Sequence, residues 1–145
     1  MCLKSWHKSN SYANQYYNNL ERGSNVIQNP SDGIARTLSW TGKVGLPYLS
    51  DYGYATDFTK CTNTLHNYNS DECKTNDWLF SNYWYWTMSP DSLDANCMWG
   101  VSVIGRVTHD RARNGFGVHP VLTLSSLALA ETGTGSKSAP YVLTS

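Results

Sequence analysis

The feature that most constrains the fold of this chain is an alternation of large and small side chains in residues 84–90. Trp84, Trp86 and Met88 occupy every second position. That spacing is the period of a β-strand with one buried face. We therefore expect these three side chains to face the core from a central strand.

Three further segments show the same period and predict additional strands. They are residues 41–48, 98–107 and 116–124. Val44 and Leu46 would share one face of the first segment, and Trp99, Val101 and Val103 one face of the second. A proline inside the third segment restricts it to a sheet edge, a strand start or a bulge. Short turns between successive strands favour antiparallel pairing.

A helix is predicted over residues 9–22. Tyr12, Tyr16 and Leu20 recur at every fourth position, which places them on one helical face, and Gly23 supplies a left-handed stop. The simplest interpretation is that these rings pack on the sheet, and a row of sugar-stacking tyrosines is the alternative.

Shorter elements complete the predicted fold. Residues 50–55 fit an N-cap followed by one helical turn. Residues 108–115 fit a charged turn, residues 133–138 a flexible loop and residues 141–143 a last short strand. The result is one α+β domain with long loops.

Length and composition indicate what kind of domain this is. A chain of 145 residues has the usual size of a single domain. Its 6 Trp, 10 Tyr and 3 Phe predict an aromatic core rather than an aliphatic one. Only 15% of the residues are charged, so we expect a neutral, hydrogen-bonding surface of the kind common in exported β-rich proteins.

The charge balance and the hydropathy pattern exclude two classes of partner. Lys plus Arg equals Asp plus Glu at 11 each, so the clustered positive charge that nucleic acids attract is missing. No apolar run approaches the roughly 20 residues of a membrane span, and no signal segment opens the chain. A membrane would be reached only through an anchor absent from this sequence.

The cysteine spacing predicts one disulfide. Cys61 and Cys73 bracket a polar insert, as a loop-closing bridge does in an oxidising compartment. A metal site is less favoured, because no Cys-x-x-Cys spacing occurs and His66 is the only histidine between them. Cys2 and Cys97 fit either a second bridge or two buried thiols.

Several blocks of the sequence, in this order, resemble a bacterial extracellular domain family. They are residues 43–55 (KVGLPYLSDYGYA), 86–90 (WTMSP), 117–124 (GVHPVLTL), 133–135 (GTG) and 139–143 (APYVL). The family has no known function and occurs at the C-terminal end of surface and pilin-like proteins of gut Gram-positive bacteria. The resemblance covers residues 40–145 of the single domain.

The resemblance implies a fold similar to C-type-lectin-like and sulfatase-modifying-factor domains, in which an aromatic-rich sheet carries a long variable region. Residues 91–115 would be that exposed region, and the flanking blocks would be scaffold. The domain would display a binding face at the cell surface, behind a pilin-type helix absent here. His119 stands where the family mostly has Arg, so a pH-sensitive contact replaces an expected ion pair.

A cysteine nucleophile and a calcium site are the two chemical alternatives to this scaffold interpretation. A nucleophile would require Cys97 paired with His109 or His119, but no catalytic signature surrounds Cys97, so a buried or bridged cysteine is favoured. A calcium cage would draw on Asp51, Asp57, Asp71, Asp77, Asp91, Asp94 and Asp110. The carboxylate pairs of sugar-binding C-type lectins are absent, and we expect neither a metal nor a cofactor, with calcium as the weaker alternative.

Two kinds of ligand site were also considered. Tyr52, Tyr54, Trp99 and Asn96 suit a saccharide, because rings stack on sugar faces while amides bond hydroxyls; the alternative is that these rings are core. The arginines beside Asp110 suit a carboxylated ligand, and a solvated turn is the favoured alternative.

The sequence thus predicts a C-type-lectin-like α+β domain, with a mainly antiparallel twisted sheet, an N-terminal helix and long loops. We expect a non-enzymatic extracellular adhesion module whose partner is a surface glycan or protein. The predicted ligand-binding residues are Asp91, Asp94, Asn96, Trp99, Arg106, Asp110, Arg111 and Arg113, with the loops of residues 51–73 beside them. The alternatives are a formylglycine-generating-type enzyme using Cys97 and a purely structural pilus subunit.

Overall fold

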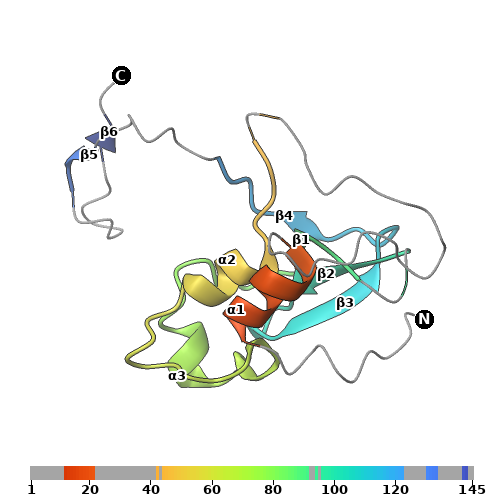
Figure 1. The fold of residues 1–145 in the computed structure, drawn as a ribbon, viewed down its shortest axis with the longest axis horizontal. Coiled ribbons are helices and arrows are strands. Elements are labelled where there is room, and N and C mark those ends of the chain that lie inside the picture. The colour runs from red at the N-terminus through yellow and green to blue at the C-terminus, as the bar shows by residue number, and fades with distance from the viewer. Residues whose placement is uncertain are drawn as a thin grey trace.

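The fold combines short helices with a four-stranded, mostly antiparallel sheet (Figure 1), which confirms the α+β class. The computed structural model describes residues 12–21, 42, 44–91, 94, 96–122, 130–133 and 142–143. Cys2, Trp40 and most of the predicted loop at residues 133–138 lie outside this set. The described part of the predicted last strand is confirmed.

The four strands are arranged in the order β3-β2-β1-β4. Their bounds are Tyr85–Pro90 for β1, Cys97–Val101 for β2, Val107–Arg111 for β3 and Gly117–Val118 for β4. β1, β2 and β3 pair antiparallel, whereas β4 pairs with β1 in parallel. A second ladder joins β5 (Ala130–Thr132) to β6 (Val142–Leu143).

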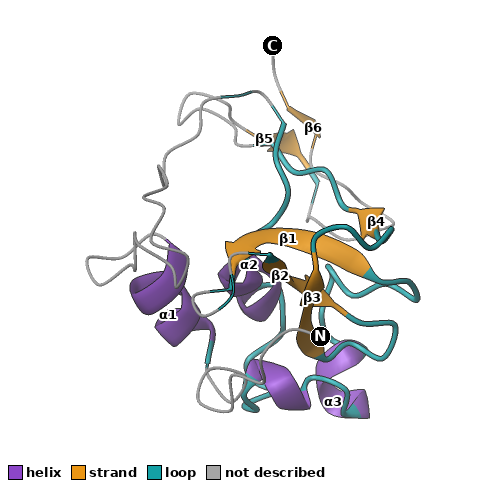
Figure 2. Cartoon of the chain, turned by 90° about the vertical axis from the view of Figure 1, so that its right-hand side faces the viewer, coloured by secondary structure: helices purple, strands orange, loops and turns teal. Residues whose placement is uncertain are grey.

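Short helices lie beside the sheet (Figure 2). They are α1 (Ala13–Tyr16), which continues into the π-helix η1 (Tyr17–Glu21), then α2 (Leu49–Tyr54), the 3-10 turn η2 (Leu65–Asn67) and α3 (Asp71–Lys74). α1 and α2 pack so closely that a Cβ added to Gly53 would lie only 2.6 Å from the Cβ of Ala13. The predicted N-terminal helix and the predicted helical turn at residues 50–55 are both confirmed within the described residues.

The buried face of the N-terminal helix differs from the predicted one. Ala13 and Tyr16 are buried, but Tyr12 is 51% exposed and precedes the first helical residue. There its backbone N–H donates to the side chain of Gln15 at 2.9 Å. Because Tyr12 starts the helix instead of lying on its inner face, the expected row of packed tyrosines reduces to Tyr16.

The core lies between these helices and the sheet, and it is aromatic as predicted. Trp99, Tyr52, Tyr68 and Tyr85 are among its largest fully buried side chains. The three tyrosine hydroxyls each donate to a backbone carbonyl oxygen, at distances of 2.6, 3.2 and 3.1 Å. Burial of these polar groups is therefore compensated by hydrogen bonds.

The predicted inner face of β1 is wrong. Tyr85, Thr87 and Ser89 are 0% exposed, whereas of the three residues predicted to face inward only Trp86 is buried, and Trp84 and Met88 are half-buried. Thr87 donates to the carbonyl oxygen of Trp99 at 2.8 Å. Small hydroxyl side chains with satisfied hydrogen bonds let the helices approach the strand closely, so the deepest face of β1 is the polar one.

The bulky face of β1 is covered by the segment that leads into β4. The Phe116 ring packs on Trp84 and Trp86, with ring centroids 5.0 and 4.5 Å apart. The indole N–H of Trp86 donates to the carbonyl oxygen of Asn114 at 3.3 Å. β1 is therefore covered on both faces, which explains why alternation alone misidentified the inner one.

The prediction of one strand over residues 98–107 is wrong, since a turn interrupts it. β2 ends at Val101, and Gly105 adopts a φ of +84°, a left-handed conformation that suits glycine. Val103 is consequently 42% exposed in the turn and does not continue the buried face. The chain re-enters the sheet as β3 within residues 107–111, part of which was predicted to be a charged turn.

Two other predicted strands are reduced. In residues 41–48 the described part contains only an isolated antiparallel bridge between Gly45 and Val121. Val44 is 54% exposed there, and Tyr48 is the N-cap of α2. The glycine and proline in this segment weaken strand pairing. The predicted strand at residues 116–124 is represented by β4, which is short and parallel rather than antiparallel.

Candidate functional site

The residues predicted to bind a ligand divide into buried and exposed groups. Trp99 is 1% exposed and Asp91 is 2% exposed, so neither presents its side chain to a ligand. For Trp99 the alternative interpretation as a core ring is the correct one. The expectation that residues 91–115 form an exposed variable region is wrong for β2, whose inward side chains belong to the core.

Asp91 and His109 form a buried ion-pair geometry under the first helix. The Asp91 carboxylate contacts His109 Nδ1, and the imidazole stacks on Trp99 with ring centroids 5.0 Å apart. Tyr16 meets the other side of this cluster through an edge contact with Trp99 at 5.7 Å. Burial, together with nearby acidic groups, raises the pKa of the Tyr16 hydroxyl. This cluster connects the helix to the hairpin; the Asp91 carboxylate is closed to solvent, whereas the His109 side chain is 17% exposed.

The exposed and partly exposed members of the predicted set, apart from Arg106, gather at one end of the β2–β3 hairpin. They are Asp94, Asn96, Asp110, Arg111 and Arg113. The backbone N–H of Ala112 donates to the carbonyl oxygen of Asn96 at 3.0 Å, which joins the two chain segments. Within the described residues no ion pair links Arg111 or Arg113 to a carboxylate.

Arg106 does not join that group. It lies in the turn at the opposite end of the hairpin, where its charge and desolvation together lower the pKa of His66, desolvation being the larger cause. A single site that uses all three arginines is therefore excluded by the register of β2 and β3.

The cysteines that the structure describes are all disulfide-bonded. Cys61 and Cys73 form the predicted disulfide, with Cα atoms 4.8 Å apart. Cys97 is also disulfide-bonded, and its partner lies outside the described residues. In this state Cys97 has no thiolate to offer as a nucleophile.

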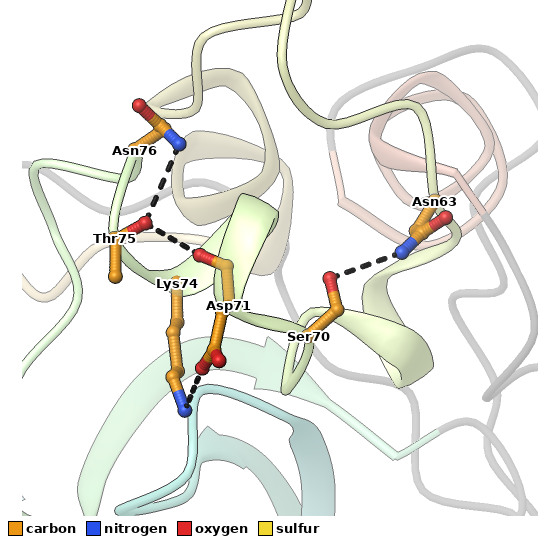
Figure 3. A network of polar contacts seen from close by, with 6 residues as sticks. All are labelled: Asn63, Ser70, Asp71, Lys74, Thr75 and Asn76. Carbon is orange, nitrogen blue, oxygen red and sulfur yellow. Dashed lines mark hydrogen bonds and ion pairs between the residues drawn. The ribbon is translucent and has the colours of Figure 1, made fainter.

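The insert between Cys61 and Cys73 is held by polar contacts around α3 (Figure 3). Lys74 pairs with Asp71 at 2.7 Å, and the side-chain amide of Asn63 donates to the Ser70 hydroxyl at 3.2 Å. These contacts are solvent-exposed and individually weak. Together with the disulfide they define one conformation of the insert.

A second surface, which the sequence did not reveal, flanks this insert. Thr56 and Asp77 form an isolated antiparallel bridge, and both are buried at 6% exposure. The bridge is framed by two backbone bonds, from Asp57 N–H to Asn76 O at 3.0 Å and from Trp78 N–H to Ala55 O at 3.3 Å.

The residues around this bridge differ in their exposure to water. Asp57 and Trp78 are exposed and Asn76 is partly exposed, whereas Thr56 and Asp77 are buried. Trp78 is 77% exposed, the highest value among the large apolar residues described. We call Asp57, Asn76 and Trp78 the ladder face. Leu79, the next residue, is buried.

Two more exposed rings bracket the same segment. Tyr54 ends α2 at 49% exposure, and Phe58 follows the bridge at 52%. Their ring centroids are 6.2 Å apart in an edge arrangement. Tyr54 was predicted as a sugar-stacking ring and is exposed, whereas Tyr52, named with it, is fully buried.

The inner side of the ladder carries a buried carboxyl. Asp77 Oδ1 accepts the Leu79 backbone N–H at 2.8 Å, but Oδ2 is buried without a partner among the described residues. Desolvation raises the pKa of Asp77 to about 7, against the smaller opposite effect of backbone hydrogen bonds. Burial and the nearby Asp77 raise the pKa of Tyr68 to about 12.

His119, predicted to make a pH-sensitive contact, packs on two core-edge tyrosines. Its ring stacks on Tyr85 with centroids 4.2 Å apart and meets Tyr83 edge-on at 5.2 Å. Desolvation lowers the pKa of His119. The neutral imidazole is therefore the form that this stacking arrangement favours.

The metal alternative is considered next, for the described residues. No group of three or more His, Cys, Asp or Glu side chains lies together as metal ligands there. In the same part of the chain, no helix has the length and apolar character needed to cross a bilayer.

Comparison with family models, curated proteins and solved structures finds no match to this chain. The hairpin end and the ladder face are therefore the two candidate functional surfaces of the described residues.

Proposed function

We propose that this chain is a non-enzymatic recognition module that acts outside the cell, and that it binds its partner through the ladder face and the neighbouring rings. The observation that carries the proposal is Trp78, which is 77% exposed beside the disulfide-closed insert. Exposed aromatic side chains are the residues that most often dominate binding energies.

The backbone that carries Trp78 is rigid, which favours a role of the exposed ring in binding. The residues before and after Trp78 are buried, and the backbone there is fixed by hydrogen bonds to the Ala55 segment and by the Asp77 side chain. A ring presented on such a backbone loses little conformational entropy when it meets a partner. The exposed Asn96 and Arg113 lie at the other end of the β2–β3 hairpin from the turn that contacts the insert, and they form a separate candidate surface.

The disulfides support an extracellular location. Bridges such as Cys61–Cys73 persist in oxidising compartments and are rare in the cytosol. The finer fold proposal, a C-type-lectin-like domain from the end of a pilin-like surface protein, rests on the sequence resemblance given above. An aromatic-cored sheet and helices with long connections agree with it in outline.

The enzymatic alternative requires a reactive Cys97, and an oxidised Cys97 argues against it. Alkylation with iodoacetamide before reduction, followed by mass spectrometry, separates the two hypotheses. We expect no modified Cys97 in the native protein. Rapid, selective labelling at Cys97 would favour the enzyme instead.

Retention on surfaces tests the recognition proposal directly. The fluorescently labelled domain, with its disulfides intact, is incubated with intact bacteria, epithelial cells and mucin-coated plates. We expect retention that is lost in the variant Tyr54→Ser/Phe58→Ser/Trp78→Ser and kept in Val118→Ala, an exposed apolar control on β4. Equal retention of all three proteins would refute the proposed surface, and self-association in place of retention would favour a structural pilus subunit.

A further inference from the structure

We propose that the ladder face is a subsite for a neutral saccharide ring, in which Trp78 stacks on the sugar while Asp57 and Asn76 accept hydrogen bonds from its hydroxyl groups. This inference rests on the proposed recognition function and specifies its ligand. It places the sugar beside the insert, not on the β2–β3 hairpin.

The indole of Trp78 supplies the apolar half of such a site. One face of a pyranose carries C–H groups that pack on an aromatic ring, and its rim carries hydroxyls that require polar partners. The backbone around Trp78 is fixed between the buried Asp77 and Leu79. The ring therefore projects from a rigid support with most of its surface open to a ligand.

Asp57 supplies a pre-oriented acceptor on the same face. Its Oδ1 accepts the backbone N–H of Thr59 at 2.9 Å and the Thr59 hydroxyl at 2.7 Å. These bonds fix the carboxylate and, as the main cause, lower its pKa, so that it is ionised at neutral pH. Oδ2 has no partner among the described residues and is left to accept a ligand hydroxyl.

Asn76 supplies a second acceptor across the ladder. Its side-chain amide nitrogen donates to the Glu72 carbonyl oxygen at 2.7 Å and lies next to Thr75 (Figure 3). That contact leaves the carboxamide oxygen without a partner among the described residues. The backbone of Asn76 is bonded to Asp57 at 3.0 Å, so the two acceptors flank the same pair of backbone segments.

The charges around the face select among ligand classes. Residues 57–76 contain three carboxylates, Asp57, Asp71 and Glu72, against two lysines, one of which is paired with Asp71. An acidic saccharide or phosphorylated ligand would be repelled by this balance. On the ladder face itself a carboxylate and an amide accompany Trp78, so a ligand that stacks there must also offer hydrogen-bond donors. A ligand rich in hydroxyl donors and without charge fits both constraints.

Titration with defined sugars tests the inference. The full chain is titrated with neutral oligosaccharides built from β-linked glucose, N-acetylglucosamine, mannose or galactose, and with an oligogalacturonate as the acidic comparison, by calorimetry and tryptophan fluorescence. We expect at least one neutral oligosaccharide to bind. Trp78→Ala should weaken that binding at least about tenfold, as loss of one stacked ring would, while Trp78→Phe retains part of it.

Asp57→Asn tests the polar half of the subsite and Val118→Ala controls for unrelated surface changes. We expect about a threefold to tenfold loss in the first and none in the second. The inference is overturned if no neutral oligosaccharide binds up to about 10 mM, if the acidic one binds better, or if Trp78→Ala leaves binding unchanged. If sugars fail while surface retention still depends on the three rings, the saccharide inference is wrong and the recognition function stands; if retention also fails, both are wrong.

Discussion

Replacing the buried Asp77 by asparagine should change how the stability of this domain depends on pH. The Asp77 carboxyl is 6% exposed, and one of its oxygens has no partner among the described residues. Desolvation disfavours the charged form, which raises the pKa from 3.8 to about 7. The folded state therefore holds a proton on Asp77 over a range in which the unfolded chain has lost it.

The sign and the size of the effect follow from that difference. Between about pH 4 and pH 7 the folded state binds more protons, so the free energy of unfolding falls as pH rises, and it levels off above the folded pKa. A rise from 3.8 to about 7 corresponds to a total loss of about 4 kcal/mol, since one pH unit is worth about 1.4 kcal/mol. This is a large fraction of the stability of a domain of this size.

Asp77→Asn keeps the shape and still accepts the Leu79 N–H, but it cannot ionise. The hydroxyl of Thr56 on the facing segment is also buried without a partner among the described residues, and it makes no hydrogen bond with the Asp77 side chain. A buried amide that stays unpaired costs about 1–3 kcal/mol. We therefore expect a net gain of about 1–3 kcal/mol at pH 8 and a net loss at pH 4.

Urea denaturation of both proteins from pH 4 to pH 8, with disulfides intact, measures this directly. The difference between wild type and variant isolates Asp77, because every other titrating group is common to both. A variant that shows the same pH slope as the wild type would refute the assignment of that slope to Asp77. A variant less stable at pH 8 would show that the carboxylate is compensated in the fold.

Three further variants test other contacts that hold the fold together. Replacing Cys73 and its partner by serine should lower the free energy of unfolding by about 3 kcal/mol, because the bridge closes a loop with a sequence separation of 12; urea denaturation measures it. Ser89→Ala removes a buried hydroxyl that donates to Glu21 and accepts a backbone N–H, and should cost about 1–3 kcal/mol by calorimetry. Gly53→Ala would press against Ala13 and should lower Tm and speed hydrogen exchange in both helices. Unchanged values would contradict the contacts described.

Local signals predicted the elements that depend on near neighbours in sequence. The N-terminal helix, the turn of α2 and the Cys61–Cys73 bridge follow from helical spacing, capping and loop closure, each set within a few residues or one short insert. The aromatic core followed from composition. These predictions hold because the interactions that form them are short-range.

The inner face of β1 could not be obtained in this way. The strand has covers on both sides, with helices over Tyr85, Thr87 and Ser89 and the Phe116 segment over the tryptophans. Hydrophobic alternation distinguishes a core face from a solvent face, but here neither face is solvent. The deeper face is decided by hydrogen bonds to distant residues, such as Ser89 to Glu21 at 2.6 Å.

Part of the predicted ligand surface on the hairpin is buried for a related reason. Its charged residues suggested a loop, yet β3 pairs with β2 over Val107–Arg111 and directs His109 inward onto Trp99. Polar residues that alternate with buried ones in a strand have the same composition as a turn. Only pairing distinguishes the two, and pairing is not written in the local sequence.

The exposure of Trp78 is the clearest case of this dependence on pairing. It is followed in the sequence by Leu79 and Phe80, and a run of large apolar residues favours a buried ring. Asp77, which bridges to Thr56, is buried, whereas Trp78 and Asp57 beside the bridge are exposed. The same bridge thus places an ionisable carboxyl in the core and an aromatic ring in water. A shift of one residue in that bridge would exchange the two, and it would remove the proposed binding face along with the pH dependence.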